Sequence, residues 1–320
     1  MEAIPPPVDT EILVKELSPD KFVRKTNYGN NEVYVFSNND SPNLMREVGR
    51  LREIAFRKAG GGTGKALDID EYDISPKGFK QLIVWNPIVK EIIGGYRFIH
   101  GKDLEITSDG KLTGATAELF DFSEKFIKEY LPYSIELGRS FVRPEYQATS
   151  SSRKGIFSLD NLWDGLGAII VDNPGIEYFF GKFTMYKNYN VKARNLLLYF
   201  LKKFFPDTEN LAVPRESVIL KFDNEEYYEN LFNKDSYEEN RKILISEIRK
   251  LGEFIPPLIN AYMNLSSTMH TYGTAINHHF GGVEETGILI KIKDIYPSKK
   301  HRHISTYQKN KGANAKASLY

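Results

Sequence analysis

Cysteine is absent from the 320-residue chain. This absence excludes disulfides, thiolate metal sites and a cysteine nucleophile together. The formal net charge is only +1, so no overall field favours nucleic acid, and we expect none as a partner. The N-terminal MEAIPPPVDTE lacks the apolar core of a signal peptide, and no apolar run approaches the length of a membrane-spanning helix. We therefore expect a cytoplasmic protein, for which peripheral contact with the inner face of the membrane stays open.

Aromatic residues are plentiful, with 19 Tyr and 20 Phe, which suits both a sheet-rich core and an apolar substrate channel. Alternating apolar residues predict strands, and apolar residues at helical spacing predict helices. Strands are expected at 32–37, 81–85, 88–99, 135–142, 176–184 and 286–292, and helices near 41–59, 123–129, 158–172, 191–205, 237–251 and 257–268. This order predicts an α/β fold in which helices flank a mixed central sheet.

The composition also predicts how the chain is divided. Residues 1–30 are expected to form an N-terminal arm and residues 31–295 one domain, with a helical extension from about residue 207. Residues 296–320 carry lysine and arginine but no acidic residue. Such a basic tail either contacts an anionic membrane surface or is a disordered, solubilising end.

The strand expected at 135–142 contains charged residues in an apolar run. Glu136, Gly138 and Arg139 interrupt it, and a buried charge is costly unless it is paired or used. Side chains alternate along a regular strand, so Glu136 and Arg139 would point to opposite faces. A bulge would redirect one of them, and Gly138 is well suited to a bulge.

Four local motifs resemble a known family. They are Arg52 with Phe56 (RxxxF), the acidic run Asp68–Asp73 (DIDEYD), Gly95-Tyr96-Arg97, and Glu136–Ser140 (ELGRS) followed by Val142, Pro144 and Tyr146. In this order they resemble the GNAT-like N-acyltransferases that make lipoamino acids, especially the ornithine/glycine lipid synthases. The same pattern is shared by the related acyl-homoserine-lactone synthases.

The resemblance implies a reaction as well as a fold. An N-acyltransferase of this kind moves a long fatty acyl group, with or without a 3-hydroxyl, to the α-amine of a small amino acid. The donor is a thioester of acyl carrier protein or CoA, and the product begins lipoamino-acid synthesis. A thioester is already activated, so no cofactor, metal or covalent acyl-enzyme is expected.

The resemblance also implies roles for single residues. It implies a bulge within 136–141 that splays the central strand and leaves backbone N–H groups for the thioester carbonyl. Glu136 is the candidate general base, or orients the ammonium, and its alternative is a salt bridge with an arginine. Arg139 lies beside it in the catalytic site. The candidate substrate-binding residues are Arg52, Asp70, Asp73 and Arg97. The alternative for Arg97 and Arg139 is a buried ion-pair network, and the alternative for Asp70 and Asp73 is an ordinary solvated loop.

The acyl donor is expected to bind where the central strand leads into the next helix. The candidate donor-binding residues are Phe141, Val142, Arg143, Arg153, Lys154 and Gly155. A loop before a helix N-terminus supplies N–H donors for phosphate. Of the usual GNAT pattern Q/RxxGxG/A, only Gly155 is present, which favours acyl carrier protein over CoA.

Two other motifs give weaker hypotheses. Residues 59–66 nearly spell a P-loop, but Ala66 stands where Ser or Thr should bind Mg²⁺, so a flexible lid is the preferred interpretation. His270 with the pair His278-His279 could suggest a metal site, but no third ligand stands at a persuasive spacing. The alternatives left open are an autoinducer-type synthase, an acetyl-CoA acetyltransferase, and a non-catalytic protein that binds lipid or nucleotide.

Overall fold

The computed structural model describes residues 1–147, 155, 157–216, 219–220 and 224–308. In this part of the chain an eight-stranded sheet has the order β1-β2-β3-β4-β6-β7-β10-β9. Its strands are β1 (Phe22–Lys25), β2 (Glu32–Phe36), β3 (Lys80–Asn86), β4 (Glu91–His100), β6 (Ser134–Val142), β7 (Tyr178–Met185), β10 (Val283–Lys291) and β9 (His270–Asn277). Neighbours are antiparallel except for β6 and β7, which run parallel. A separate pair is formed by β5 (Phe120–Phe122) and β8 (Ala212–Pro214).

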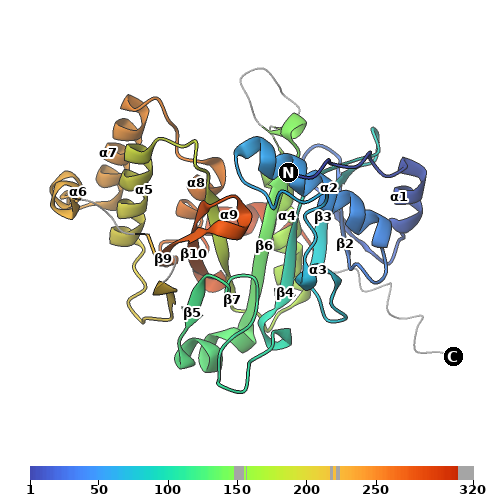
Figure 1. Cartoon of the computed structure of the whole chain (residues 1–320), viewed down its shortest axis with the longest axis horizontal. Coiled ribbons are helices and arrows are strands. Elements are labelled where there is room, and N and C mark those ends of the chain that lie inside the picture. The colour runs from blue at the N-terminus through green and yellow to red at the C-terminus, as the bar shows by residue number, and fades with distance from the viewer. Residues whose placement is uncertain (148–154, 156, 217–218, 221–223, 309–320) are drawn as a thin grey trace.

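Helices cover both faces of the sheet (Figure 1). The helix α2 (Pro42–Ala59) begins after Ser41 and ends at Gly60, whose φ of +97° suits a left-handed helix end. Its predicted apolar stripe, including Leu44 and Leu51, is buried against one face. Each such leucine contributes about 1.5–3 kcal/mol by its burial. The opposite face packs against α4 (Ser158–Asp172) and α5 (Val191–Phe204).

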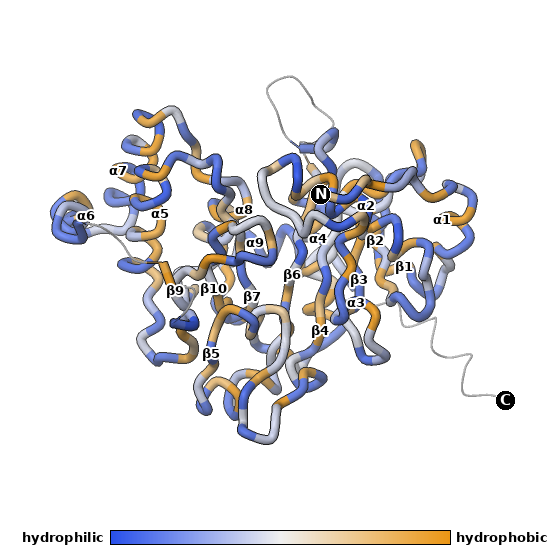
Figure 2. Tube along the Cα trace, in the orientation of Figure 1, coloured by the Kyte–Doolittle hydropathy of each residue, from blue (hydrophilic) through white to orange (hydrophobic). Residues whose placement is uncertain are grey.

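Six further helices in the described residues pack around these three, and several add buried residues to the same cores. They are α1 (Thr10–Glu16), α3 (Glu71–Ile74), α6 (Glu225–Leu231), α7 (Tyr237–Lys250), α8 (Pro257–Met263) and α9 (Pro297–His303). Figure 2 shows apolar residues concentrated on the central strands and hydrophilic residues along outer helices such as α7. The predicted helix at 123–129 is a π-helix at Phe126–Tyr130.

The strand β6 has the predicted bulge. Gly95 pairs with Phe141 and Arg97 with Gly138, so three residue steps on β6 face two on β4. Arg139 lies inside this step with a φ of +47°. The parallel pairs of β6 and β7 extend only from Ser134 to Leu137, although both strands continue. The central strand is therefore bulged and splayed from β7, as the sequence predicted.

The N-terminal residues are more ordered than a loose arm. β1 lies within the predicted arm and pairs with β2 as an edge strand. The Glu2 amide donates to the Gly64 carbonyl, and the Val8 amide donates to the Glu47 carboxylate. The acidic run is partly helical, because Asp70 caps the short α3 through a capping box with Asp73. Gln81 of β3 donates to Asp73, and Arg97 of β4 pairs with Asp70, so polar contacts hold the run against the sheet.

The C-terminal part is not only helical. The unpredicted strand β9 pairs with β10, and β10 pairs with β7, so the extension completes the main sheet. The start of the predicted basic tail forms α9, which packs on α4. His303 Nδ1 lies 2.8 Å from Asp164, and a Cβ added at Gly167 would lie 2.1 Å from the His303 carbonyl oxygen. Residues 309–320 lie outside the described part of the chain.

Candidate active site

One face of the sheet has a row of buried polar side chains at its centre. Neighbouring strands supply one residue each, because side chains on a pleated sheet alternate between its faces. The row consists of Gln81, Arg97, Glu136, Lys182 and Glu285, from β3, β4, β6, β7 and β10. Buried polar groups at this density need partners or a function.

A cavity of about 660 Å³ opens where β6 and β7 diverge. Both faces of the sheet line it, because Lys182 and Thr184 reach it from one face of β7 and Phe183 and Met185 from the other. Its wall is otherwise largely apolar, with Phe56, Phe141, Val142, Leu159, Leu258, Ile259 and Phe280 among the lining residues. The cavity therefore joins a polar end to an apolar channel.

Glu136 lies at the polar end. Its side chain is buried, and its Oε1 accepts hydrogen bonds from the Thr116 amide and the Thr116 hydroxyl, both at 2.7 Å. Burial raises the pKa of Glu136, although the Thr116 hydrogen bonds and the Lys182 charge oppose the shift. The described residues donate no hydrogen bond to Oε2, so this oxygen can accept a substrate proton.

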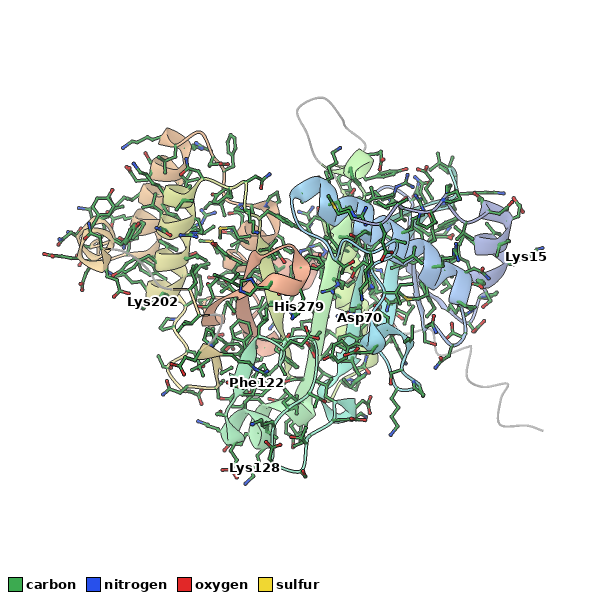
Figure 3. All side chains as sticks on the ribbon, in the orientation of Figure 1. Lys15, Asp70, Phe122, Lys128, Lys202 and His279 are labelled. Atoms are coloured by element: carbon green, nitrogen blue, oxygen red, sulfur yellow. The ribbon has the colours of Figure 1, made fainter. Side chains whose placement is uncertain are left out.

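Three arginines and three aspartates form an ion-pair network beside Glu136. Arg52 Nη1 lies 3.1 Å from Asp73. Arg97 Nη1 lies 2.7 Å from Asp70 and 3.2 Å from Asp73. The Arg139 guanidinium lies 3.0 Å from Asp68 and 3.5 Å from Asp70. Figure 3 shows Asp70 over the central strands. Burial alone would raise the pKa of Asp73, but the charges of Arg52, Arg97 and Arg139 outweigh burial and lower it.

The bulge directs Arg139 into this network. Its side chain pairs with two aspartates, and its guanidinium lies 4.7 Å from the centre of the Phe280 ring. Arg139 therefore lies on the same face of the sheet as Arg97 and Glu136, which a regular strand would not allow. Glu136 and Arg139 both line the cavity. Neither arginine of the cavity, Arg97 or Arg139, pairs with Glu136 in the described residues, so the predicted alternative of such a salt bridge is not observed.

Comparison with known proteins identifies the family. Residues 51–154 match the family model of an acetyltransferase (GNAT) domain. The chain is 56% identical over 309 residues to a glycine N(alpha)-acyltransferase of Phocaeicola vulgatus, a match that covers 97% of this chain and 94% of that protein. A glycine N(alpha)-acyltransferase of Bacteroides thetaiotaomicron is also 56% identical, with 96% of this chain and 91% of that protein covered. The chain belongs to the glycine N(alpha)-acyltransferase family.

The family assignment confirms the GNAT-like fold and the acyltransferase class predicted from the sequence. A solved structure of an N-acyl amino acid synthase from uncultured soil microbes overlaps 86% of this chain and 95% of its own, at 10% identity and a TM-score of 0.40. No helix in the described residues of the acyltransferase is long and apolar enough to cross a membrane. Contact with an anionic membrane surface stays a prediction.

The structure brings together part of the predicted site of this acyltransferase. Six predicted residues line the cavity, namely Arg97, Glu136, Arg139, Phe141, Val142 and Gly155. Arg52, Asp70 and Asp73 instead belong to the ion-pair network, and Arg143 pairs with Glu91 and Glu145 at the surface. Arg153 and Lys154 lie outside the described residues. The predicted roles in binding substrate and donor stay predictions.

Sequence reasoning missed three polar residues of the acyltransferase site. Glu285 is buried and Lys182 is partly buried. The two form an ion pair at 3.6 Å and line the cavity with Thr116. For Lys182 the available signal was a charged residue within an apolar strand, the same signal that identified Glu136. Lys182 interrupts YFFGKFTM in this way, but no family motif drew attention to it.

The glycine-rich loop of the acyltransferase binds one of its own carboxylates. Glu53 accepts hydrogen bonds from the Thr63 amide, the Thr63 hydroxyl and the Gly64 amide. In a P-loop such amides would bind phosphate, so this arrangement disfavours nucleotide binding. His270 lies at the start of β9 and His278 just beyond its end, about 25 Å apart along an extended strand, so these two histidines do not share a metal.

We expect Gly114→Ala to slow the acyltransferase. Gly114 has a φ of +150°, and a Cβ added there would lie 3.0 Å from Glu136 Oε2. The contact would displace the carboxylate, and kcat should fall on the order of 10-fold because reacting groups tolerate little misplacement. Gly110→Ala is the matched control, since it also has a positive φ of +80° but nothing within 4 Å. Steady-state kinetics and unfolding on both variants test this, and equal kcat values would contradict it.

Proposed function

We propose that this acyltransferase transfers a long fatty acyl group from a thioester to the α-amine of glycine, producing an N-acylglycine. Glycine is the acceptor in the names of both relatives, each 56% identical to this chain. The observation that carries the proposal is the cavity itself. A buried carboxylate stands at its polar end, and one of its oxygens accepts no hydrogen bond from the described residues. An apolar channel continues through the splayed sheet.

The geometry suits direct transfer. The amine of glycine attacks the thioester carbonyl carbon, its proton passes to Glu136, and the C–S bond breaks to release the thiol. The proton taken by Glu136 leaves with the thiol, so the enzyme ends unchanged. In a bulge, the backbone groups of the extra residue lie outside the ladder. We assign the amides near Arg139 to the oxyanion that forms on the carbonyl oxygen.

We propose acyl carrier protein as the donor carrier, with CoA as the alternative. The support is the departure of residues 150–155 from the usual GNAT phosphate-binding pattern, of which only Gly155 is present. The product, with or without a 3-hydroxyl on the chain, would enter lipoamino-acid synthesis.

The test is a reaction of the purified enzyme with palmitoyl thioesters of acyl carrier protein and of CoA. Each is offered with glycine, alanine or ornithine, and both thiol release and product mass are measured. We expect N-palmitoylglycine, with faster turnover from the carrier protein. Thiol release without N-acylglycine, or preference for another amino acid, would overturn the assignment of glycine. Faster turnover from CoA would overturn the assignment of the carrier alone.

A further inference from the structure

Lys182 is the least neutralised cation at the polar end of the cavity. Arg97 and Arg139 each face two aspartates of the ion-pair network. Lys182 instead shares a single carboxylate, that of Glu285, at 3.6 Å. Glu285 has its own hydrogen bonds, from Thr184 at 3.1 Å and from Asn277 at 2.9 Å. Its charge is therefore partly satisfied without Lys182.

The ammonium of Lys182 has donors to spare. An ammonium carries three N–H groups. In the described residues Lys182 Nζ donates one hydrogen bond, to the Ala115 carbonyl, and makes one ion pair, with Glu285. The side chain is 8% exposed and lines the cavity. A largely buried cation with an N–H group that no described residue accepts is suited to bind an anionic group that enters the cavity.

One peptide group fixes the spacing between Lys182 and Glu136. This is the peptide group between Ala115 and Thr116. Lys182 donates to its carbonyl oxygen, and Glu136 accepts a hydrogen bond from its N–H. A carbonyl and an N–H of one trans peptide point in opposite directions, so the ammonium and the carboxylate stand on opposite sides of it, at most about 8 Å apart. The amine and the carboxylate of an α-amino acid lie about 3 Å apart. With one hydrogen bond at each end, the amino acid spans a distance comparable to that between Lys182 and Glu136.

We propose that Lys182 binds the carboxylate of the acceptor amino acid while Glu136 receives the proton of its amine. This assignment rests on the proposed function. Glu285 holds Lys182 in place, so it is a positioning residue, and it is the counter-ion of Lys182 when no acceptor is bound. The acceptor carboxylate would otherwise be buried without a cation, which is costly. The site therefore selects acceptors that are zwitterions over simple amines.

The test combines a substitution with a change of acceptor. Wild type and Lys182→Met are each assayed with glycine and with glycinamide, whose neutral amide replaces the carboxylate. We expect kcat/KM for glycine to fall on the order of 10–100-fold in the variant, because a charge-assisted hydrogen bond is lost. The value for glycinamide should change little. Each acceptor is compared between the two enzymes, so differences in amine reactivity cancel.

Further variants separate binding from folding. Lys182→Gln keeps a donor for the Ala115 carbonyl and should behave like Lys182→Met. Lys187→Met, an exposed lysine beyond the end of β7, is the control and should leave both acceptors unchanged. If both Lys182 variants fail to fold, acetate should still inhibit the wild type competitively against glycine, and lack of inhibition would overturn the proposal.

The outcomes distinguish the two proposals. If kcat/KM falls equally for glycine and glycinamide, Lys182 has only a structural role. If kcat/KM falls for neither acceptor, Lys182 does not bind the acceptor. In both cases glycine acylation by the wild type stands. If the wild type acylates neither acceptor, the proposed function fails first.

Discussion

Glu136→Gln is expected to lower kcat by about 10²–10⁴-fold, the usual contribution of a positioned general base. Glutamine keeps the shape of the side chain and can still accept from Thr116, but it cannot take the proton of the amine. The KM for the acyl donor should stay close to that of the wild type. Glu47→Gln is the matched control, because Glu47 is also a buried glutamate but lies outside the cavity, paired with Arg50.

The pH profile gives an independent test of Glu136. The base must be ionised to act, and burial raises its pKa above the ordinary 4.5. The acidic limb of kcat/KM should therefore lie above pH 4.5 in the wild type, with the rate rising as pH increases through the raised pKa. The limb should be absent from the residual activity of Glu136→Gln. An unchanged limb in the variant would assign it to another group.

A measurement of unfolding separates the loss of catalysis in Glu136→Gln from misfolding. A carboxyl group whose pKa is raised by folding contributes its stability when protonated, and that contribution is lost as pH rises through the folded pKa. Above the folded pKa the ionised Glu136 is therefore a cost to the fold. The neutral glutamine should leave the denaturant midpoint unchanged or slightly higher. A lower midpoint would indicate that the kinetic loss has a structural origin.

Asp73→Asn is expected to cost about 3–5 kcal/mol of unfolding free energy, the typical effect of breaking a buried ion pair. Asp73 accepts from both Arg52 and Arg97, and both arginines are almost fully buried. Asparagine would leave two guanidinium groups with too little negative charge. Chemical denaturation at pH 7 measures the loss, and a change below about 1 kcal/mol would contradict the assignment.

The control and the pH dependence sharpen this prediction. Asp109→Asn removes the exposed ion pair with Lys111 and should leave the denaturation midpoint unchanged. Folding lowers the pKa of Asp73 below the ordinary 3.8, so its stabilisation is present above pH 3.8 and is lost as pH falls through the folded pKa. The difference in unfolding free energy between wild type and Asp73→Asn should be constant above pH 3.8 and should become smaller below it. The same variant should also lose activity, because Arg97 lines the cavity.

Local patterns predicted the elements that local chemistry specifies. An apolar run identified β6, the apolar stripe identified α2, and Gly138 beside two charges identified the bulge. The sequence HTYGTAIN of β9 is largely polar and has Gly273 at its centre. It is a strand because β10 pairs with it, and no local pattern records that partner. The helix α9 has little apolar surface of its own and depends on polar contacts of His303 and Arg302 with α4.

The sequence by itself determined the family motifs, the acyltransferase class, and the presence of Glu136 and Arg139 in one strand. Only the tertiary structure decided which charges meet. Arg52, Arg97 and Arg139 pair with the acidic run because α2, β4 and the bulge of β6 bring them to one face of the sheet. Lys182 and Glu285 are 103 positions apart and meet because β10 pairs with β7. Spacing within an element is set by covalent geometry, whereas contacts between distant strands depend on sheet order, which local sequence does not encode.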